Sequence, residues 1–384
     1  MTSRQRVEKA SNHEKPDRVP LDFGGDQTGI NKEAYQNLIQ FLGLKEEIEL
    51  IHNMGQVAKV SEEVLRRLEI DTRYIFPKTP FESKVKEVER DGTVYLESTD
   101  EWGIVRSKPK NYGHWYDITN FPLKEATLND LDSYPWPNPK DPRRFNGLYQ
   151  EAEKIFKETD FAIATGVNGS MFEMAWYLCS MERFLRDMIL NRSFVERMLD
   201  ILLQFWLDFY EVFLKEVGDF IHIVNVGDDL GTQDGPMLSP ELYRLLVKPR
   251  QKILFKYIHD HTKAKLWYHS CGSIYLFVPD FVEIGVDILN PVQISAKDMD
   301  SKRLKKEFGN DIVFWGGGCD TQHVLPFKKP KEVKREVRMQ IRDFAPGGGY
   351  VFTQIHNVPV ETPPQNVITM FETAKKYGRY PIDL

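Results

Sequence analysis

The chain has 384 residues, a formal net charge of -6 and 41% hydrophobic residues, an ordinary balance for a soluble globular protein. Basic residues alternate with acidic ones instead of clustering, which argues against a nucleic-acid-binding surface. No apolar run approaches the roughly 20 residues that span a bilayer, and the first 20 residues contain no apolar signal segment. We therefore expect a cytoplasmic protein without nucleic-acid or membrane partners. The oligomeric state stays open, a homodimer included.

Short apolar runs recur along the chain, each followed by a longer stretch with helical periodicity. The runs cover residues 20–23, 72–76, 161–165, 220–226, 265–268, 286–289, 312–315 and 350–355. The clearest helical stretches are 180–217, 239–261 and 328–345, the second with Ser239 as N-cap and Pro240 at its first position. Strands that alternate with helices form parallel βαβ units. Eight of them over this length predict an α/β fold, a TIM-type (β/α)8 barrel in a single domain spanning residues 1–384.

Residues 78–140 interrupt this alternation. They contain a hairpin-like pair of strands with Asp91-Gly92 as the turn, followed by an aromatic, proline-rich segment. We interpret this hairpin and loop as an insertion between the second and third barrel strands.

The candidate site follows from the place where such barrels do chemistry, the carboxyl ends of the strands. The polar residues at these ends are Asp228 and Asp229 after the fourth run, His269 and Cys271 after the fifth, Cys319 and Gln322 after the seventh, and His356 and Asn357 after the eighth. Gln322 and Asn357 are the candidate cofactor-binding residues.

Three of these residues predict a zinc site. His269 and Cys271 are two positions apart, so on an extended backbone their side chains share one face. Cys319 reaches the same mouth from another strand. An imidazole and two thiolates suit zinc, and three protein ligands leave a fourth position open, as in catalytic sites. His356 offers either a further ligand or a contact with the substrate. The competing interpretation is a thiol that only fills core space, which we prefer for Cys179 in a helical stretch.

Three carboxylates are candidate catalytic groups. The adjacent pair Asp228 and Asp229 suits acid–base work, because neighbouring carboxylates raise each other's pKa. Equally, one of the pair caps the next turn, and since successive side chains point in opposite directions, at most one faces the pocket. Glu173 begins the helix after the third strand, where capping or packing is the alternative role.

The chain resembles the uroporphyrinogen decarboxylase superfamily over nearly its whole length. The segments that carry the resemblance are KPDRVPLDF, GSMFEMAWYLCSMERFLRDM, GDDLGTQDGPMLSPELYRLLVKP, YHSCGSI, DILNPVQISAKDMD, VFWGGGCDTQHVLP and GGGYVFTQIHNVPVETPPQNVITMFETAKKYGRYP. The resemblance implies a β/α barrel with its site at the carboxyl mouth. The arginine-rich R-Q-A-G-R-Y motif that holds substrate carboxylates in the true decarboxylase is missing, and the corresponding region reads VPLDFGGDQTGINK.

His269 and Cys271 instead match the zinc-dependent methyltransferases of cobamide pathways, in which a His, a Cys two residues later and a distant Cys bind zinc. In the coenzyme M methyltransferases the distant Cys lies in the strand-eight turn, where this chain has His356. A His-Cys-Cys set with Cys319 and a His-Cys-His set with His356 both stay open.

The resemblance implies methyl transfer between a small methylated substrate, or a small methyl acceptor, and a corrinoid supplied by a separate protein. Zinc would be the Lewis acid, and Asp228 or Asp229 with His356 would orient or protonate the departing group. The insertion is the candidate rim on which the corrinoid protein docks. The alternatives are a decarboxylase of a smaller carboxylic acid and a non-catalytic barrel that binds a corrinoid or tetrapyrrole.

Overall fold

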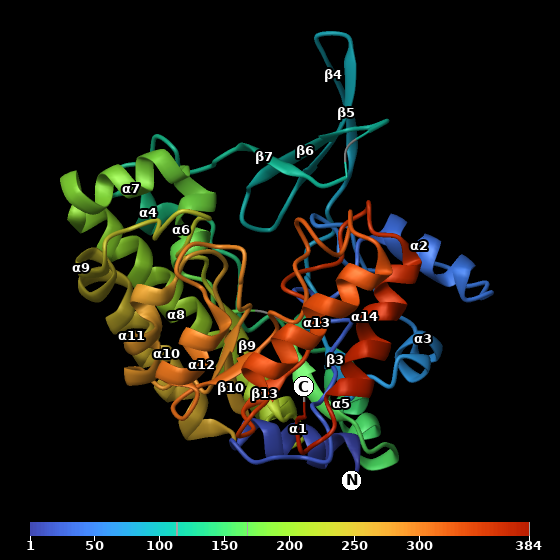
Figure 1. Ribbon diagram of the computed structural model, residues 1–384. Helices are drawn as coiled ribbons and strands as arrows, with labels where there is room; N and C mark the ends of the chain where they lie inside the picture. Colours follow the sequence, from blue (N-terminus) through green and yellow to red (C-terminus); the bar gives the residue numbers. More distant parts are fainter. Residues whose placement is uncertain (113, 167, 384) are drawn as a thin grey trace.

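The computed structural model describes residues 1–112, 114–166 and 168–383. Within them, seven parallel strands form a curved sheet in the order β13-β12-β11-β10-β9-β8-β3. Figure 1 shows the chain with its helices and strands labelled where there is room. The strands are β3 (Thr72–Ile75), β8 (Ala162–Thr165), β9 (Ile223–Gly227), β10 (Lys265–His269), β11 (Ile288–Asn290), β12 (Val313–Trp315) and β13 (Tyr350–Val351). Each strand overlaps one of the apolar runs of the sequence.

The first apolar run closes the sheet into a barrel. Leu21 forms a parallel bridge with Phe352, next to β13. On its other side, the carbonyl of Leu21 accepts the backbone N–H of Asp71 at 2.8 Å, just before β3. The fold is thus the expected TIM-type α/β barrel, with residues 20–23 in the place of the first strand.

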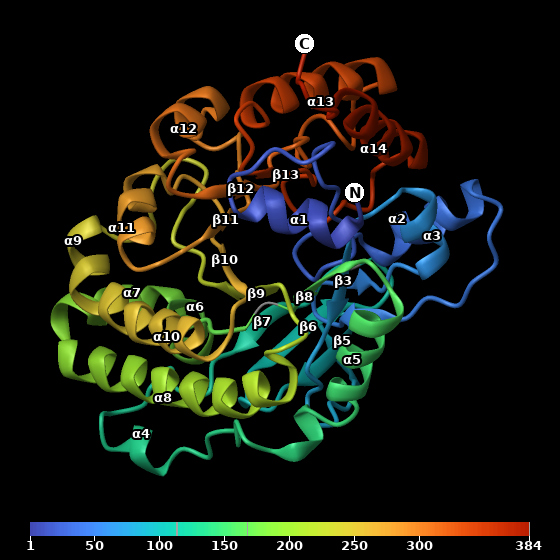
Figure 2. The same cartoon turned by 90° about the horizontal axis from the view of Figure 1, so that it is seen from below.

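Helices surround the strands (Figure 2). They are α2 (Lys32–Phe41), α3 (Glu62–Arg67), α5 (Leu148–Glu158), α6 (Phe172–Cys179), α7 (Met181–Leu190), α8 (Arg192–Val217), α9 (Pro240–Leu242), α10 (Lys248–His261), α11 (Val278–Glu283), α12 (Ser301–Phe308), α13 (Pro330–Phe344) and α14 (Pro364–Tyr377). Strand side chains alternate between this outer layer and the barrel interior. Leu266 and Tyr268 pack in the outer core, whereas Trp267 belongs to the smaller interior core.

Helix α1 (Ser3–Ser11) closes the amino end of the barrel, opposite the mouth (Figure 2). Its N-terminus is a capping box, in which Thr2 accepts the N–H of Gln5 and the Gln5 side chain accepts the N–H of Thr2. Val7 and Ala10 are buried in the interior core. The cavity described below therefore opens at the mouth, beyond the carboxyl ends of the strands.

The insertion between β3 and β8 is confirmed, and its described part is larger than one hairpin. It forms an antiparallel sheet of β4 (Lys86–Arg90), β5 (Thr93–Thr99), β6 (Val105–Pro109) and β7 (Asp117–Asn120). Asp91 and Gly92 have φ of 50° and 75°, the left-handed values that a tight two-residue turn requires. The β4–β5 hairpin projects from the body as an arm (Figure 1). Strand β7 lies in the proline- and aromatic-rich stretch, where alternation is too brief to signal it, and β6 lies just before that stretch.

The expected helices are found with two interruptions. Residues 180–217 divide at Asn191, whose φ of -138° and ψ of 57° separate α7 from α8. Residues 239–261 begin as expected, with the Ser239 hydroxyl accepting the N–H of Leu242. They then pass through a π-helical turn, Tyr243–Val247, before α10, because Pro249 has no N–H to continue the ladder.

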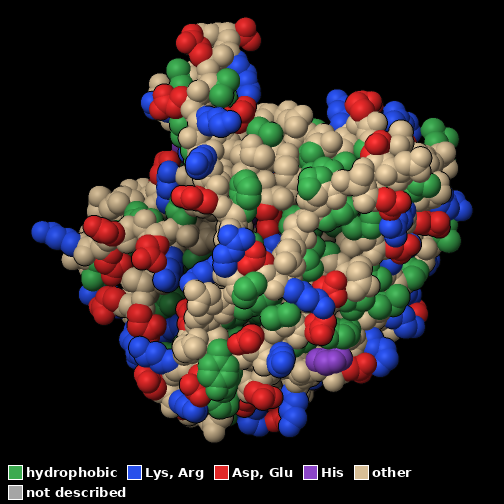
Figure 3. Space-filling model, turned by 180° about the vertical axis from the view of Figure 1, so that it is seen from behind, with side chains coloured by type: hydrophobic (Ala, Val, Ile, Leu, Met, Phe, Trp, Pro, Cys, Tyr) green, Lys and Arg blue, Asp and Glu red, His purple; other side chains and the backbone are tan. Residues whose placement is uncertain are grey.

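Charges of both signs are interspersed over the face shown in Figure 3, as the alternation along the sequence suggests. Among the described helices, none combines the length and the apolar character that a membrane crossing requires.

Candidate metal centre and cavity

Three potential metal ligands meet at the mouth of the barrel. In the described part of the chain, His269, Cys271 and His356 form the group whose ligand atoms all lie within 4.8 Å of one another. His269 ends β10, Cys271 follows two residues later on the same face, and His356 comes from the loop after β13. The rings of the two histidines lie 5.6 Å apart in an edge-to-face arrangement.

The loop that carries Cys271 packs unusually close to the loop after β9. A Cβ on Gly272, which has a φ of +86°, would lie 2.4 Å from the backbone of Gly231. A Cβ on Gly231 would in turn lie 2.6 Å from the carbonyl oxygen of Cys271. The two glycines therefore allow the contact that sets the position of the Cys271 backbone.

Asn290, the last residue of β11, orients His269. Its Nδ2 donates to the carbonyl of Trp315 at 2.8 Å, so its Oδ1 points toward His269 Nδ1, 2.7 Å away. That oxygen only accepts, so Nδ1 carries the proton and the lone pair of Nε2 faces Cys271 Sγ at 3.3 Å. An imidazole anchored through one nitrogen and open at the other is the usual arrangement of a metal ligand.

The donor set fits zinc. Burial lowers the pKa of His269, and burial beside His269 lowers the pKa of His356 to about 4, so both imidazoles are neutral near pH 7. Neutral imidazoles and a cysteine sulfur are the donors that zinc prefers. Typical Zn–N and Zn–S lengths place N and S roughly 3.5 Å apart in a tetrahedral site, close to the His269–Cys271 separation.

Cys319 is not part of this group, which corrects its expected place beside His269 and Cys271. It is fully buried in the outer core, between the sheet and the surrounding helices. Burial near Glu336 of α13 raises the pKa of its thiol. After the turn at Gly316 and Gly317, both with positive φ, the side chain faces outward. Cys179 is likewise a core residue, as expected.

Asp228 also lies outside the cavity lining, and the expectation that it is catalytic is corrected to a capping role. Its carboxylate accepts three backbone N–H groups at the start of α6, from Met171, Phe172 and Glu173, at 2.9–3.1 Å. It also accepts the hydroxyl of Ser170 at 2.8 Å. Burial raises the pKa of Asp228, and these bonds oppose that rise.

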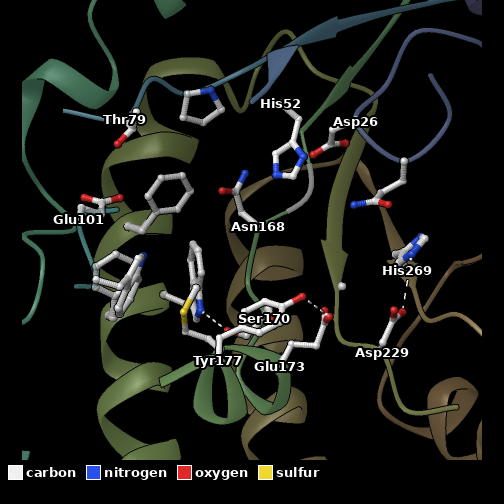
Figure 4. Close-up of a pocket in the computed structure, with 18 of the residues that line it drawn as sticks. Asp26, His52, Thr79, Glu101, Asn168, Ser170, Glu173, Tyr177, Asp229 and His269 are labelled. Carbon is white, nitrogen blue, oxygen red and sulfur yellow. Dashed lines mark hydrogen bonds and ion pairs between the residues drawn. The ribbon is translucent and has the colours of Figure 1, made fainter. Parts of the chain in front are cut away.

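Asp229 and Glu173 do face the cavity (Figure 4). Asp229 Oδ1 accepts the backbone N–H of Cys271 at 2.7 Å and lies 3.7 Å from His269 Nε2. Glu173 Oε1 accepts the hydroxyl of Tyr177 at 2.9 Å. Burial, together with the charges of Asp229 and Asp228, raises the pKa of Glu173 well above its usual range. This crowding of carboxyl groups disfavours the ionised form of Glu173.

The two residues expected to contact a cofactor, Asn357 and Gln322, form hydrogen bonds within the chain. Asn357 ties two loops together, accepting the N–H of Gly29 at 2.7 Å and donating to the carbonyl of Asp26 at 2.8 Å. Gln322 is exposed and accepts from Gln233 at 2.7 Å. Neither residue is in the described lining of the cavity.

Comparisons with known proteins agree with this architecture. A family model for uroporphyrinogen decarboxylase (URO-D) matches residues 118–377, about two thirds of the chain. The chain belongs to the uroporphyrinogen decarboxylase family. A uroporphyrinogen decarboxylase from Rickettsia felis is 26% identical over 180 residues, 44% of this chain and 49% of that protein, so the match spans about half of the relative's length. A methyltransferase from Methanosarcina mazei has the same fold, with a TM-score of 0.66 and 18% identity, over 98% of this chain and 99% of that one.

The cavity of this member of the uroporphyrinogen decarboxylase family has few Lys or Arg side chains that are not already in ion pairs. Arg106 forms an ion pair with Asp100, and Arg144 pairs through both guanidinium nitrogens with Glu101. Among the cations of the described lining, Lys78 forms no ion pair and is exposed at the rim. A substrate with several carboxylates therefore finds little to neutralise it here.

Several residues of the site were not predicted from the sequence. Asn290 ends the sixth strand, so the strand-end rule would have found it. His52, the last residue of β1 (Leu50–His52), also lines the cavity. Trp102 and Trp206 reach the cavity from the insertion and from α8, and no local pattern marks them.

Proposed function

We propose that this protein is a zinc-dependent methyltransferase that moves a methyl group between a small substrate and the cobalt of a corrinoid carried by a separate protein. The observation that carries the proposal is the convergence of His269, Cys271 and His356, with His269 oriented by Asn290. The fold shared with a methyltransferase from Methanosarcina mazei supports it.

His269, Cys271 and His356 would hold the metal, with His356 replacing Cys319 of the expected set. Bound zinc supplies Lewis acidity toward a leaving oxygen, nitrogen or sulfur. Asn290 keeps the Nε2 lone pair of His269 aimed at the site, and Asp229 holds the Cys271 loop through its backbone N–H.

Glu173 and Tyr177 serve the departing group. Burial and the neighbouring carboxylates raise the pKa of Glu173, which favours its protonated form, and the Tyr177 hydroxyl fixes the orientation of that carboxyl. The proton is then available to a group that leaves with negative charge. The corrinoid protein would dock over the mouth, with the insertion as its rim.

Metal analysis of the purified chain tests the ligand set. We expect about one zinc per chain in the wild type under reducing conditions, and loss of most of it in His269→Ala, Cys271→Ala and His356→Ala. Cys319→Ala is the matched control, because it removes a buried thiol outside the group and should retain zinc. A wild type without stoichiometric zinc contradicts the proposal. Zinc lost in Cys319→Ala but kept in His356→Ala would restore the set first expected from the sequence.

Activity is measured without oxygen, with cob(I)alamin as the methyl acceptor and methylcobalamin formation followed by absorbance. The three ligand variants should fall to the background rate, whereas Cys319→Ala should keep activity in proportion to its folded fraction. A non-catalytic corrinoid-binding barrel predicts a bound cobalamin spectrum without methyl transfer.

A further inference from the structure

The cavity beside His269, Cys271 and His356 has one polar side and one aromatic side. Its volume is about 500 Å³, within the range of small-molecule sites. One side carries His269, Asp229 and Glu173, and the opposite side lies beside Glu101 and Thr79 (Figure 4). The second side is aromatic. Methyl transfer by itself does not require aromatic side chains beside the metal ligands.

The aromatic wall consists of Trp102, Phe205, Trp206 and Phe209. Their rings contact one another in series, with centroids 4.6 Å apart for Trp102–Phe205, 5.0 Å for Phe205–Trp206 and 5.5 Å for Trp206–Phe209. Each side chain is only 2–7% exposed. The rings therefore support one another and present a continuous surface instead of separate mobile side chains.

Two polar groups at the aromatic wall are already engaged by neighbouring residues. The indole N–H of Trp206 donates to the carbonyl of Ser170 at 2.7 Å. The Arg144 guanidinium lies 5.8 Å from the Phe205 ring centre and is engaged by Glu101. Apart from the indole N–H of Trp102, the side chains of the wall offer no further polar atom to a ligand, so an apolar, flat group gains most by covering it.

We propose, on the basis of the methyltransferase function above, that the methyl donor is an aryl methyl ether. Its ring lies against the aromatic wall, and its ether oxygen faces His269, Cys271 and His356. In the reaction the CH3–O bond breaks and a CH3–Co bond forms. The cobalt(I) of the partner's corrinoid supplies the electron pair and becomes methyl-cobalt(III), and the aryl oxygen takes up one proton to leave as a phenol.

Two features favour this donor over a quaternary ammonium ion. The aromatic rings pack on one another and do not surround a point, so they form a wall and not the cage that such cations occupy. A quaternary ammonium ion also leaves as a neutral amine and needs neither a Lewis acid nor a proton, whereas an aryl ether leaves as an anion and needs both.

Calorimetric titration of the zinc-loaded wild type with 2-methoxyphenol tests the aromatic wall. We expect binding, weakened about tenfold or more in Phe205→Leu and Trp102→Ala, because each loses a ring that the ligand covers. Phe205→Leu retains most of the buried volume and so keeps the test valid if Trp102→Ala folds poorly. Trp115→Ala, which removes a ring that is 59% exposed and outside the described lining, is the matched control and should bind normally.

Methyl transfer is then compared for 2-methoxyphenol, methanol and tetramethylammonium with cob(I)alamin as acceptor. We expect methylcobalamin and an equal amount of catechol from 2-methoxyphenol, and much slower reaction with the other two. Three results would overturn the aryl ether proposal and leave the methyltransferase function standing. They are no binding of 2-methoxyphenol to the wild type, binding that is unchanged in both wall variants, and reaction of methanol or tetramethylammonium alone. Failure of every donor overturns both.

Discussion

Asn290 determines which nitrogen of His269 is available to a metal. Its amide is held from both ends, by the Trp315 carbonyl and by His269 Nδ1, so rotation of either side chain breaks a buried hydrogen bond. Loss of such an orienting partner typically reduces metal affinity 10- to 100-fold.

Asn290→Ala should therefore lower zinc affinity by about 10- to 100-fold, measured by competition with a chromophoric chelator. Asn366→Ala is the matched control, because Asn366 is also a buried amide that donates to backbone carbonyls, those of Leu325 and Lys328, away from the site. The control should lose thermal stability and keep zinc affinity. Equal affinities for the two variants would contradict the role of Asn290.

His222 predicts a pH dependence of stability unrelated to the site. Burial lowers its pKa to about 4, and its Nδ1 accepts the N–H of Ile163 at 3.1 Å. In the unfolded chain the imidazole of His222 takes up a proton near pH 6.5, so between pH 6.5 and 4 the unfolded state binds one proton more than the folded state. The contribution of neutral His222 to the free energy of unfolding is thus complete above pH 6.5 and is lost as the pH falls toward 4. Its upper bound is about 3 kcal/mol.

His222→Gln removes this titration. In urea unfolding series at pH 7, 5.5 and 4, the wild type should lose stability relative to the variant as the pH falls. Parallel curves for the two proteins across this range would show that His222 does not titrate as its burial implies.

At the scale of elements, β9 and the loop after it give adjacent aspartates different tasks. Asp228 points to the start of α6 and satisfies N–H groups that no residue of that helix can reach. Asp229 points to the cavity and holds the Cys271 loop. The alternation of side chains along extended backbone is the physical reason for the division.

Asp228→Ala should lower the free energy of unfolding by about 2–4 kcal/mol, because it leaves several buried donors unsatisfied. Asp229→Ala, the matched neighbour, should change stability by less than about 1 kcal/mol, since it is partly exposed, and should reduce activity much more strongly. Urea unfolding and methylcobalamin formation measure the two effects. Equal destabilisation by both variants would mean that the capping role is wrongly assigned.

At the scale of the whole molecule, α1 closes one end of the barrel and the insertion overhangs the other. The insertion contributes Glu101, Trp102 and Arg106 to the cavity, while its β4–β5 arm extends away from the body (Figure 1). The base of the insertion is therefore part of the site, and the arm is free to meet a partner.

Trimming the arm separates these roles. Replacing residues 89–94 with Asn-Gly keeps Val88 opposite Tyr95 and closes the hairpin with a favoured turn. Thermal stability and reaction with free cob(I)alamin should stay near wild-type values, because the arm is exposed and remote from the cavity. Reaction with a protein-bound corrinoid should slow if the arm guides docking, and an unchanged rate would exclude the arm from that contact.

The sequence by itself determined the barrel and two of the three proposed metal ligands, His269 and Cys271. Apolar β-branched runs separated by helical periodicity are typical of buried parallel strands, so the succession of strands and helices along the chain follows from local pattern. The spacing of His269 and Cys271 likewise determines a shared face, since side chains on extended backbone repeat every second residue.

Only the tertiary structure decided the third member of the group and the lining of the cavity. Both depend on the direction that the chain takes after a strand ends, where the regular alternation of side chains stops. Gly316 and Gly317 adopt left-handed backbone that turns Cys319 into the outer core, while the loop after β13 brings His356 to His269. The aromatic wall joins α8 to an insertion some 100 residues away, and only packing places these rings across the cavity from the metal ligands.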